Sequence, residues 1–168
     1  AEMGWIYEAE QVLSKIKQDD LKVKNSGLFA AVSADLLLKK KQYKEAIPFL
    51  EICLKNESNK VQKQRFTFLL AQLYSHAGNI PQAYSAFSKV IKLNPAFEMD
   101  FNARIYRAEL DNRDPVAVRK ELSAMLKNSN NKDYLDQIYY AIGKTYLNHS
   151  DTIKAIENFN LSVEKSTR

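Results

Sequence analysis

Apolar side chains recur along this chain at the three- and four-residue spacings of amphipathic helices. One such stripe, at spacings of four, four and three residues, consists of Phe97, Phe101, Ile105 and Ala108. The apolar face of each predicted helix must be buried against a neighbouring helix. The pattern predicts half a hairpin at 1–18, followed by four antiparallel helical hairpins near 26–56, 62–94, 97–128 and 132–166.

Several of the expected helix boundaries carry residues that end or begin a helix. Gly78–Asn79 predicts a helix end, because it offers a residue that tolerates the positive φ of a closing turn. Asn94–Pro95 ends another helix, since the residue before a proline resists the helical conformation. Asp114–Pro115 is typical of an N-cap followed by proline at the first helical position. These signals separate the predicted helices from one another.

Two stretches of the chain share one pattern of large and small residues. The first consists of Thr67, Leu70, Ala71, Tyr74, Gly78, Ala83, Phe87 and Pro95. The second consists of Tyr139, Ile142, Gly143, Tyr146, Ala155 and Phe159. The spacing resembles that of the tetratricopeptide repeat. Small residues on both helices of a hairpin, such as Ala71 and Ala83, let the two helices approach closely.

Weaker copies extend this pattern over the rest of the chain. One position of the second helix recurs at intervals of 37, 37, 35 and 37 residues, in Ala9, Ala46, Ala83, Val118 and Ala155. We therefore expect an all-α fold, a right-handed tetratricopeptide superhelix (an α-α solenoid) of antiparallel hairpins that forms a single domain over 1–168. The first helix of 97–128 lies one residue out of phase with Val118, so the repeat does not assign its surface positions.

The beginning of the chain is predicted to lie inside a hairpin. Residues 2–5 are typical of the end of a first helix and its turn, and Trp5, Ile6 and Tyr7 are apolar where a capping face would be polar. Two interpretations follow, a segment of a longer protein or a frayed end. We expect the segment, in which case a signal peptide or lipid anchor can lie outside these 168 residues.

Composition favours a soluble protein of helices joined by short loops. Hydrophobic residues make up 45% and charged residues 27% of the chain, with only 4 Gly and 4 Pro. The net charge of +5 is spread over short runs such as Lys39–Lys40–Lys41, which indicate solvated helix ends rather than a nucleic-acid surface. Cys53 stands alone and is expected to be a small buried hydrophobe. No apolar run approaches the roughly 18 residues of a membrane span.

The sequence offers little that could carry catalysis. His76 and His149 are expected in the turns between paired helices, where neither has a ligand or nucleophile at helical spacing. Phosphate-binding glycine loops, HExxH and GxSxG are absent from the sequence. We therefore predict no enzyme activity, and no catalytic, cofactor or metal site.

The concave side of a tetratricopeptide array is where a partner-binding groove is expected. The candidate groove residues are Leu28, Asp35, Arg65, Phe68, Gln72, Asn102, Arg107, Gln137, Tyr140 and Lys144. Phe68 and Tyr140 are aromatic where packing within a hairpin does not require it, so with Arg65 and Lys144 they suit an extended peptide or a helix. Ordinary half-exposed aromatics are the alternative interpretation. The set does not match the carboxylate clamp of chaperone-binding members, which needs Lys and Asn residues at these inner positions.

Residues 70–146 carry a narrower resemblance. Two runs carry it best, from Ala71–Gln72–Leu73–Tyr74 to Asn94–Pro95, and from Asn131–Lys132–Asp133–Tyr134 to Ile142–Gly143. They resemble the large tetratricopeptide lipoproteins of Bacteroidetes tied to gliding motility and type IX secretion (the PorW/SprE-like group). The resemblance implies a place on the periplasmic side of the outer membrane, with secretion-machinery subunits as partners. The lipid-attachment cysteine of such proteins is not in this sequence.

The leading hypothesis is therefore a protein–protein interaction scaffold that works with secretion-machinery subunits or a peptide segment, without a cofactor. A cytoplasmic adaptor or co-chaperone that binds an extended peptide is the alternative within the same class. An enzyme or small-molecule sensor would need a deep pocket with a titratable cluster. A structural spacer would have no partner that depends on Arg65 or Lys144.

Overall fold

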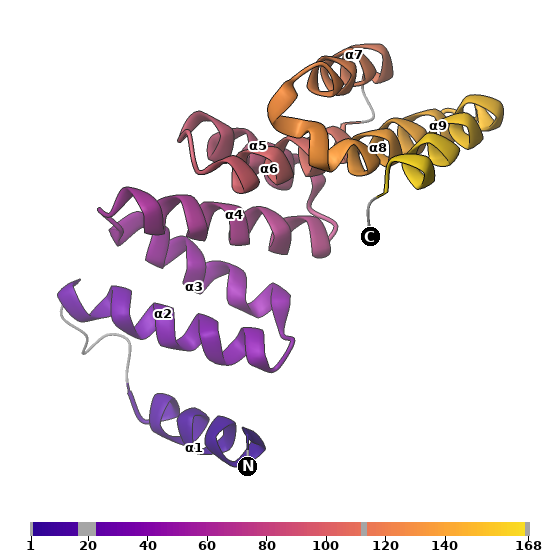
Figure 1. The fold of residues 1–168 in the computed structure, drawn as a ribbon. Coiled ribbons are helices and arrows are strands. Elements are labelled where there is room, and N and C mark those ends of the chain that lie inside the picture. Colours follow the sequence, from indigo (N-terminus) through magenta and orange to yellow (C-terminus); the bar gives the residue numbers. More distant parts are fainter. Residues whose placement is uncertain (1, 17–22, 112–113, 167–168) are drawn as a thin grey trace. The chain divides into compact units, whose positions relative to one another are not determined.

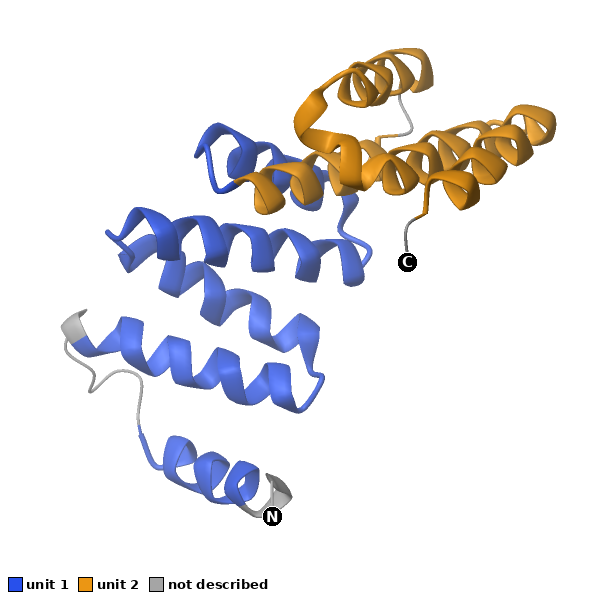
Figure 2. Ribbon diagram, in the orientation of Figure 1, with its two compact units in different colours: residues 1–96 blue, residues 97–168 orange. Residues whose placement is uncertain are grey.

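The computed structural model describes residues 2–16, 23–111 and 114–166 (Figure 1). The chain divides into two compact units, Ala1–Ala96 and Phe97–Arg168 (Figure 2). The prediction of a single solenoid domain over residues 1–168 stays a prediction. Residues 17 and 18 of the predicted first half-hairpin lie outside the described ranges.

Helices make up both units. Unit 1 contains α1 (Glu2–Ser14), α2 (Val23–Lys39), α3 (Tyr43–Asn56), α4 (Lys60–His76) and α5 (Ile80–Lys92). Unit 2 contains α6 (Phe97–Leu110), α7 (Pro115–Leu126), the 3-10 helix η2 (Ser129–Tyr134), α8 (Leu135–Leu147) and α9 (Thr152–Lys165). No strand occurs in the described ranges. The predicted all-α, helical-repeat class is confirmed.

Small residues bring the paired helices together, as the repeat pattern predicted. The pairs α2 and α3, α4 and α5, and α8 and α9 pack closely. Ala46 and Ala83 are fully buried on the second helices of their pairs, and Ala71 is fully buried on α4. At Gly143 of α8, a Cβ atom would lie only 2.6 Å from the Phe159 ring of α9. Side chains larger than these would push the paired helices apart.

The predicted helix boundaries are present as well. Gly78 closes α4 with φ of 77°, and Asn94 has φ of 48° immediately before Pro95. The Asp114 side chain accepts a hydrogen bond from the Ala117 backbone N–H at 2.9 Å, which caps α7. Asp114 thus satisfies an unpaired backbone N–H group at the start of a helix. Gly78 and Asn94 turn the chain away at helix ends.

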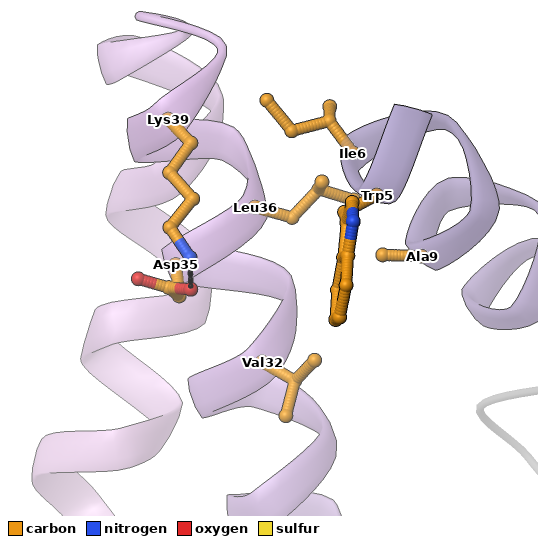
Figure 3. A pocket seen from close by; sticks show the side chains of 7 residues that line it. All are labelled: Trp5, Ile6, Ala9, Val32, Asp35, Leu36 and Lys39. Atoms are coloured by element: carbon orange, nitrogen blue, oxygen red, sulfur yellow. Dashed lines mark ion pairs between the residues drawn. The ribbon is translucent and has the colours of Figure 1, made fainter. Parts of the chain in front are cut away.

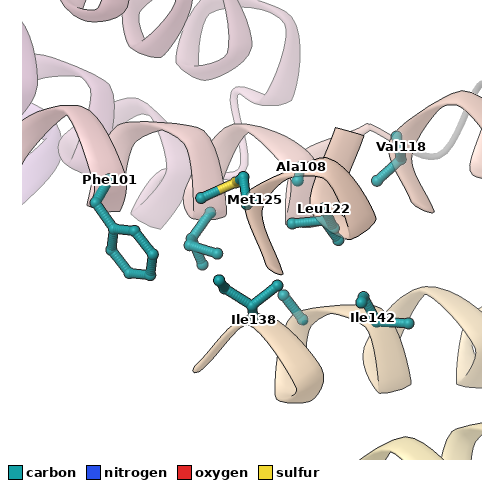
Figure 4. Packing of buried hydrophobic residues seen from close by; sticks show 9 residues of the cluster. Phe101, Ala108, Val118, Leu122, Met125, Ile138 and Ile142 are labelled. Carbon is teal, nitrogen blue, oxygen red and sulfur yellow. The ribbon is translucent and has the colours of Figure 1, made fainter. Parts of the chain in front are cut away.

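The segment 97–128 departs from the close hairpin that was predicted. Helices α6 and α7 approach each other at few points, and α7 packs more extensively on α8. The position that is alanine in α3, α5 and α9 is the larger, buried Val118 in α7, and a larger side chain at this position is expected to keep paired helices further apart. A shared core fills this space, in which Leu122 and Ile138 are fully buried (Figure 4).

The prediction of a turn at residues 2–5 is wrong. Residues 2–14 form the single helix α1. One glycine, Gly4, costs a helix interior only about 1 kcal/mol relative to alanine, and the neighbouring residues are adequate helix formers. A lone glycine was therefore insufficient evidence for a turn.

The core of unit 1 lies between α2, α3 and α4. It includes Ala34, Ala46, Leu50, Leu70 and Leu73. Cys53 of α3 is buried, as predicted, and burial raises the pKa of its thiol. At the edge of the core, Tyr74 donates its phenol hydrogen to the Glu51 carboxylate. Burial, followed by the bond to Glu51, raises the pKa of Tyr74 to about 12.

The raised pKa of Tyr74 makes the stability of unit 1 sensitive to alkaline pH. Between 10.0 and about 12 an unfolded chain has lost the Tyr74 proton while the folded chain retains it. The folded state then binds more protons, so the free energy of unfolding falls as the pH rises through this window. We expect Tyr74→Phe to reduce this fall when both proteins are unfolded in urea at a series of pH values. Identical pH slopes for the two proteins would contradict the assignment.

Candidate partner-binding site

The predicted groove residues fall in both units. Leu28, Asp35, Arg65, Phe68 and Gln72 belong to unit 1, and Asn102, Arg107, Gln137, Tyr140 and Lys144 belong to unit 2.

In unit 1 the predicted residues are spread over α2 and α4. Leu28 is 69% exposed, and Arg65 and Gln72 are also exposed. Asp35 forms an ion pair with Lys39 one turn along α2, with 2.8 Å between carboxylate and ammonium. An exposed pair of this kind contributes little to stability. These side chains are accessible, but the pockets described below bring only Asp35 into a concave surface.

Phe68 differs from the sequence interpretation. Its ring packs edge-on against Phe87 of α5, with 5.7 Å between the ring centroids. The side chain is half-buried within the α4–α5 pair. The sequence suggested that packing within the hairpin does not require an aromatic residue at position 68. The contact with Phe87 shows that the Phe68 ring does take part in this packing.

A concave surface in unit 1 lies between α1 and α2 instead. A pocket of about 570 Å³ is lined by Trp5, Ile6, Ala9, Val32, Asp35, Leu36 and Lys39 (Figure 3). The α1 side chains face Val32 and Leu36 across the opening, and the Asp35–Lys39 ion pair lies at its margin (Figure 3). Trp5 is 77% exposed, so this surface is largely apolar and accessible.

In unit 2, three predicted residues meet in one pocket. It has a volume of about 280 Å³ and is lined by Asn102, Ile105, Tyr106, Glu109, Asp136, Gln137, Tyr140 and Ser162. Helix α6 supplies Asn102, α8 supplies Gln137 and Tyr140, and α9 supplies Ser162. We call this the α6–α8–α9 pocket. The convergence of three helices makes it a defined site within one unit.

Lys144 stands beside this pocket. Its ammonium lies 3.2 Å from the Glu109 carboxylate and 5.8 Å from the centroid of the Tyr140 ring. Tyr140 also packs on Phe159 at 5.6 Å, yet the residue remains 51% exposed. The ring is thus held in position by α9 while one part of it stays available to a partner.

Hydrogen bonds orient other parts of the pocket wall. The Asn102 amide donates to the Glu98 carbonyl in the preceding turn of α6 at 2.8 Å. The Ser162 hydroxyl donates to the Asp136 carbonyl at 2.8 Å and ties α9 to the start of α8. Both bonds go to backbone carbonyl oxygens. The anionic groups of the lining are the carboxylates of Glu109 and Asp136.

Arg107 does not join this pocket. Its guanidinium donates to the Glu121 carboxylate of α7. Arg104 pairs with Asp100 at 2.7 Å and lies 4.0 Å from Glu121, so these residues form an ion-pair network between α6 and α7. Arg107 follows Asn102 by five residues, which turns it to another face of the helix.

Besides Ile105, which the sequence assigned to an apolar stripe, four lining residues were not among the predicted groove residues. Tyr106 and Glu109 follow Asn102 by four and seven residues, so the helical period alone places all three on one face. Asp136 immediately precedes Gln137, and Ser162 comes from a different helix. The first two could have been found from Asn102, whereas Ser162 required the packing of α9.

Each of the two histidines contacts a neighbouring part of the fold. His76 ends α4 and its ring lies 4.6 Å from that of Tyr43. The His149 Nδ1 atom lies 2.8 Å from the Thr145 carbonyl oxygen. Within residues 2–16, 23–111 and 114–166, no cluster of three or more His, Cys, Asp or Glu side chains could hold a metal ion. The helices in these ranges also include none with the length and apolar character needed to cross a membrane.

Comparison with known families agrees with the architecture of unit 1. The model of the tetratricopeptide repeat matches residues 65–97. This segment contains most of α4 and all of α5, the stretch in which the first copy of the pattern was found. A tetratricopeptide repeat indicates a scaffold for protein–protein interaction. A search of curated proteins gave no match to the chain. These results support the repeat and give no support to the narrower resemblance to type IX secretion lipoproteins.

Proposed function

We propose that this protein is a protein-interaction scaffold whose α6–α8–α9 pocket holds a segment of a partner protein. The observation that carries the proposal is the convergence of Asn102, Gln137 and Tyr140 in that pocket. Two of these residues come from α8 and one from α6, so the fold itself assembles the contact surface.

The size of the pocket favours a polypeptide partner. Its volume of about 280 Å³ lies just below the range of roughly 300–1,000 Å³ typical of small-molecule sites. A space of this size accepts a side chain or two from a longer segment. An extended peptide or a helix would place the rest of its length on the surrounding surface.

The first test locates the contact by photocrosslinking. A photoreactive phenylalanine analogue is placed at Gln137 in the pocket and, as a control, at exposed Lys89 of α5. We expect one partner protein from the native organism to be crosslinked at Gln137 and not at Lys89. Mass spectrometry identifies the product. Crosslinking of that partner only at Lys89, or equally at both positions, would contradict the proposal.

A place in type IX secretion is a finer proposal that rests on the resemblance of residues 70–146. It puts the scaffold on the periplasmic side of the outer membrane, with secretion-machinery subunits as partners. Sequencing of the native mature N-terminus tests it: a lipidated cysteine after a cleaved signal peptide is expected. An unprocessed N-terminus would favour the alternative, a cytoplasmic adaptor or co-chaperone that binds an extended peptide.

A further inference from the structure

The α6–α8–α9 pocket has an unusual balance of polar groups. Its lining contains the carboxylates of Glu109 and Asp136, the carboxamides of Asn102 and Gln137, and the phenol rings of Tyr106 and Tyr140. None of the lining residues is Lys, Arg or His. A partner group with negative charge would meet two carboxylates, and an apolar group would remove the Asp136 carboxylate from water without an ion-pair partner.

The chain already shows how part of this surface binds a cation. Lys144, just outside the lining, contacts Glu109 at 3.2 Å and lies over Tyr140 at 5.8 Å. This ammonium balances one of the two carboxylates. Asp136 forms no ion pair with any residue that the structure describes. The pocket therefore retains one carboxylate whose charge the described chain does not balance.

The aromatic ring of Tyr140 adds a second attraction for a cation. Tyr140 is 51% exposed and belongs to the lining. The face of a phenol ring attracts a cation that lies within about 6 Å of its centroid. The amide of Asn102 donates to Glu98, which leaves its oxygen as the acceptor for an incoming group.

These features together fit a guanidinium better than an ammonium. A guanidinium is planar, so it can stack on a tyrosine ring while its N–H groups reach a carboxylate and a carboxamide oxygen at once. A guanidinium is also less strongly hydrated than an ammonium. Its transfer from water into a partly enclosed pocket therefore costs less hydration free energy.

We propose that the α6–α8–α9 pocket receives the guanidinium of an arginine side chain from the partner segment. Asp136 is the anionic contact, Tyr140 supplies the ring face, and Asn102 and Gln137 supply carbonyl oxygens. This inference rests on the proposed function, since it names the side chain that the scaffold recognises.

The test is an NMR titration of the full chain with two short probes. The first is acetyl-Gly-Arg-Gly-amide, and the second replaces arginine with citrulline, which keeps the shape and removes the charge. We expect the arginine probe to shift the backbone amide signals of Asn102, Gln137, Tyr140 and Ser162, with an affinity in the millimolar range. The citrulline probe should bind at least about tenfold more weakly, which corresponds to about 1.4 kcal/mol.

Matched variants assign the effect to one carboxylate. Asp136→Asn should weaken the arginine probe severalfold, whereas Asp133→Asn, at an exposed position of η2, should leave its affinity unchanged. Asp136→Ser is the second pocket variant if Asp136→Asn fails to fold by circular dichroism. Equal binding of both probes, shifts that lie outside the pocket, or an absence of shifts would overturn the proposal.

Failure of this inference can be told apart from failure of the proposed function. If the partner is crosslinked at Gln137 but the two probes bind equally, the pocket is a binding site for a different side chain. If the crosslink at Gln137 is absent, the scaffold uses another surface whatever the probes do. Only the first result rules out recognition of an arginine while the pocket remains the partner-binding site.

Discussion

Gly143→Ala is expected to destabilise the protein, although alanine is the better helix former. A Cβ at this position would lie 2.6 and 2.7 Å from two ring atoms of Phe159 and 3.2 Å from the Ala155 carbonyl oxygen. Tyr140 packs on the Phe159 ring, so the ring cannot tilt away without disturbing a second aromatic contact. Overpacking of this kind costs roughly 1–3 kcal/mol, against about 1 kcal/mol gained from helix propensity. The difference is a net loss of up to about 2 kcal/mol.

Gly27→Ala is the matched control for this prediction. Gly27 also lies inside a helix, but a Cβ there would meet its nearest atom, Asn56 Cβ, at an ordinary 3.5 Å. We expect this variant to be neutral or to gain up to about 1 kcal/mol. Urea unfolding followed by circular dichroism compares both variants with the wild type. Equal effects of the two alanines would show that close approach of α8 and α9 is not the reason for Gly143.

Rescue of Gly143→Ala tests the same contact from its other side. Phe159→Leu removes the aromatic ring that the new methyl group would strike. In the double variant we expect part of the lost stability to return, because the two changes act on one contact and are not additive. If the losses of the two single variants simply add in the double variant, the cost of Gly143→Ala does not come from the contact with the Phe159 ring.

The hairpins that the sequence predicts best are those closed by small side chains. Gly143 and Ala155 mark the α8–α9 pair, and Ala71 and Ala83 mark the α4–α5 pair, because close helix approach leaves a visible requirement for Gly or Ala. Val118 replaces the small residue in α7, and there the close hairpin is absent. The same rule thus explains both the agreement and the exception.

Surface positions were harder to predict, because they depend on helix phase and on neighbours far along the chain. Arg107 was assigned to the groove although the phase of its helix was unknown, and it lies instead in the ion-pair network with Glu121. Phe68 and Tyr140 were selected by the same repeat argument, and each ring packs on a phenylalanine of the paired helix. They differ in exposure, because Phe68 is half-buried whereas Tyr140 is 51% exposed and lines the α6–α8–α9 pocket.

Truncation of Tyr140 is expected to have the second large effect, on partner affinity. Its ring is exposed, is positioned by Phe159, and stands beside the ion pair of Lys144 and Glu109. Tyrosine is among the residues that most often dominate an interface, where truncation to alanine costs about 2 kcal/mol or more. Since each 1.4 kcal/mol is a factor of about ten, the dissociation constant should rise at least about 30-fold.

Tyr7→Ala provides the control for this change. Tyr7 is a tyrosine of α1 that is 63% exposed, so its truncation removes a similar side chain from a surface outside the pocket. Circular dichroism establishes that both variants keep the helical content of the wild type.

The most direct test of the scaffold is therefore the affinity of the crosslinked partner for the wild type, Tyr140→Ala and Tyr7→Ala, measured by isothermal titration calorimetry. A partner-binding α6–α8–α9 pocket predicts that binding is lost or weakened at least about 30-fold in Tyr140→Ala and is unchanged in Tyr7→Ala. Unchanged affinity in a folded Tyr140→Ala variant would contradict the central claim.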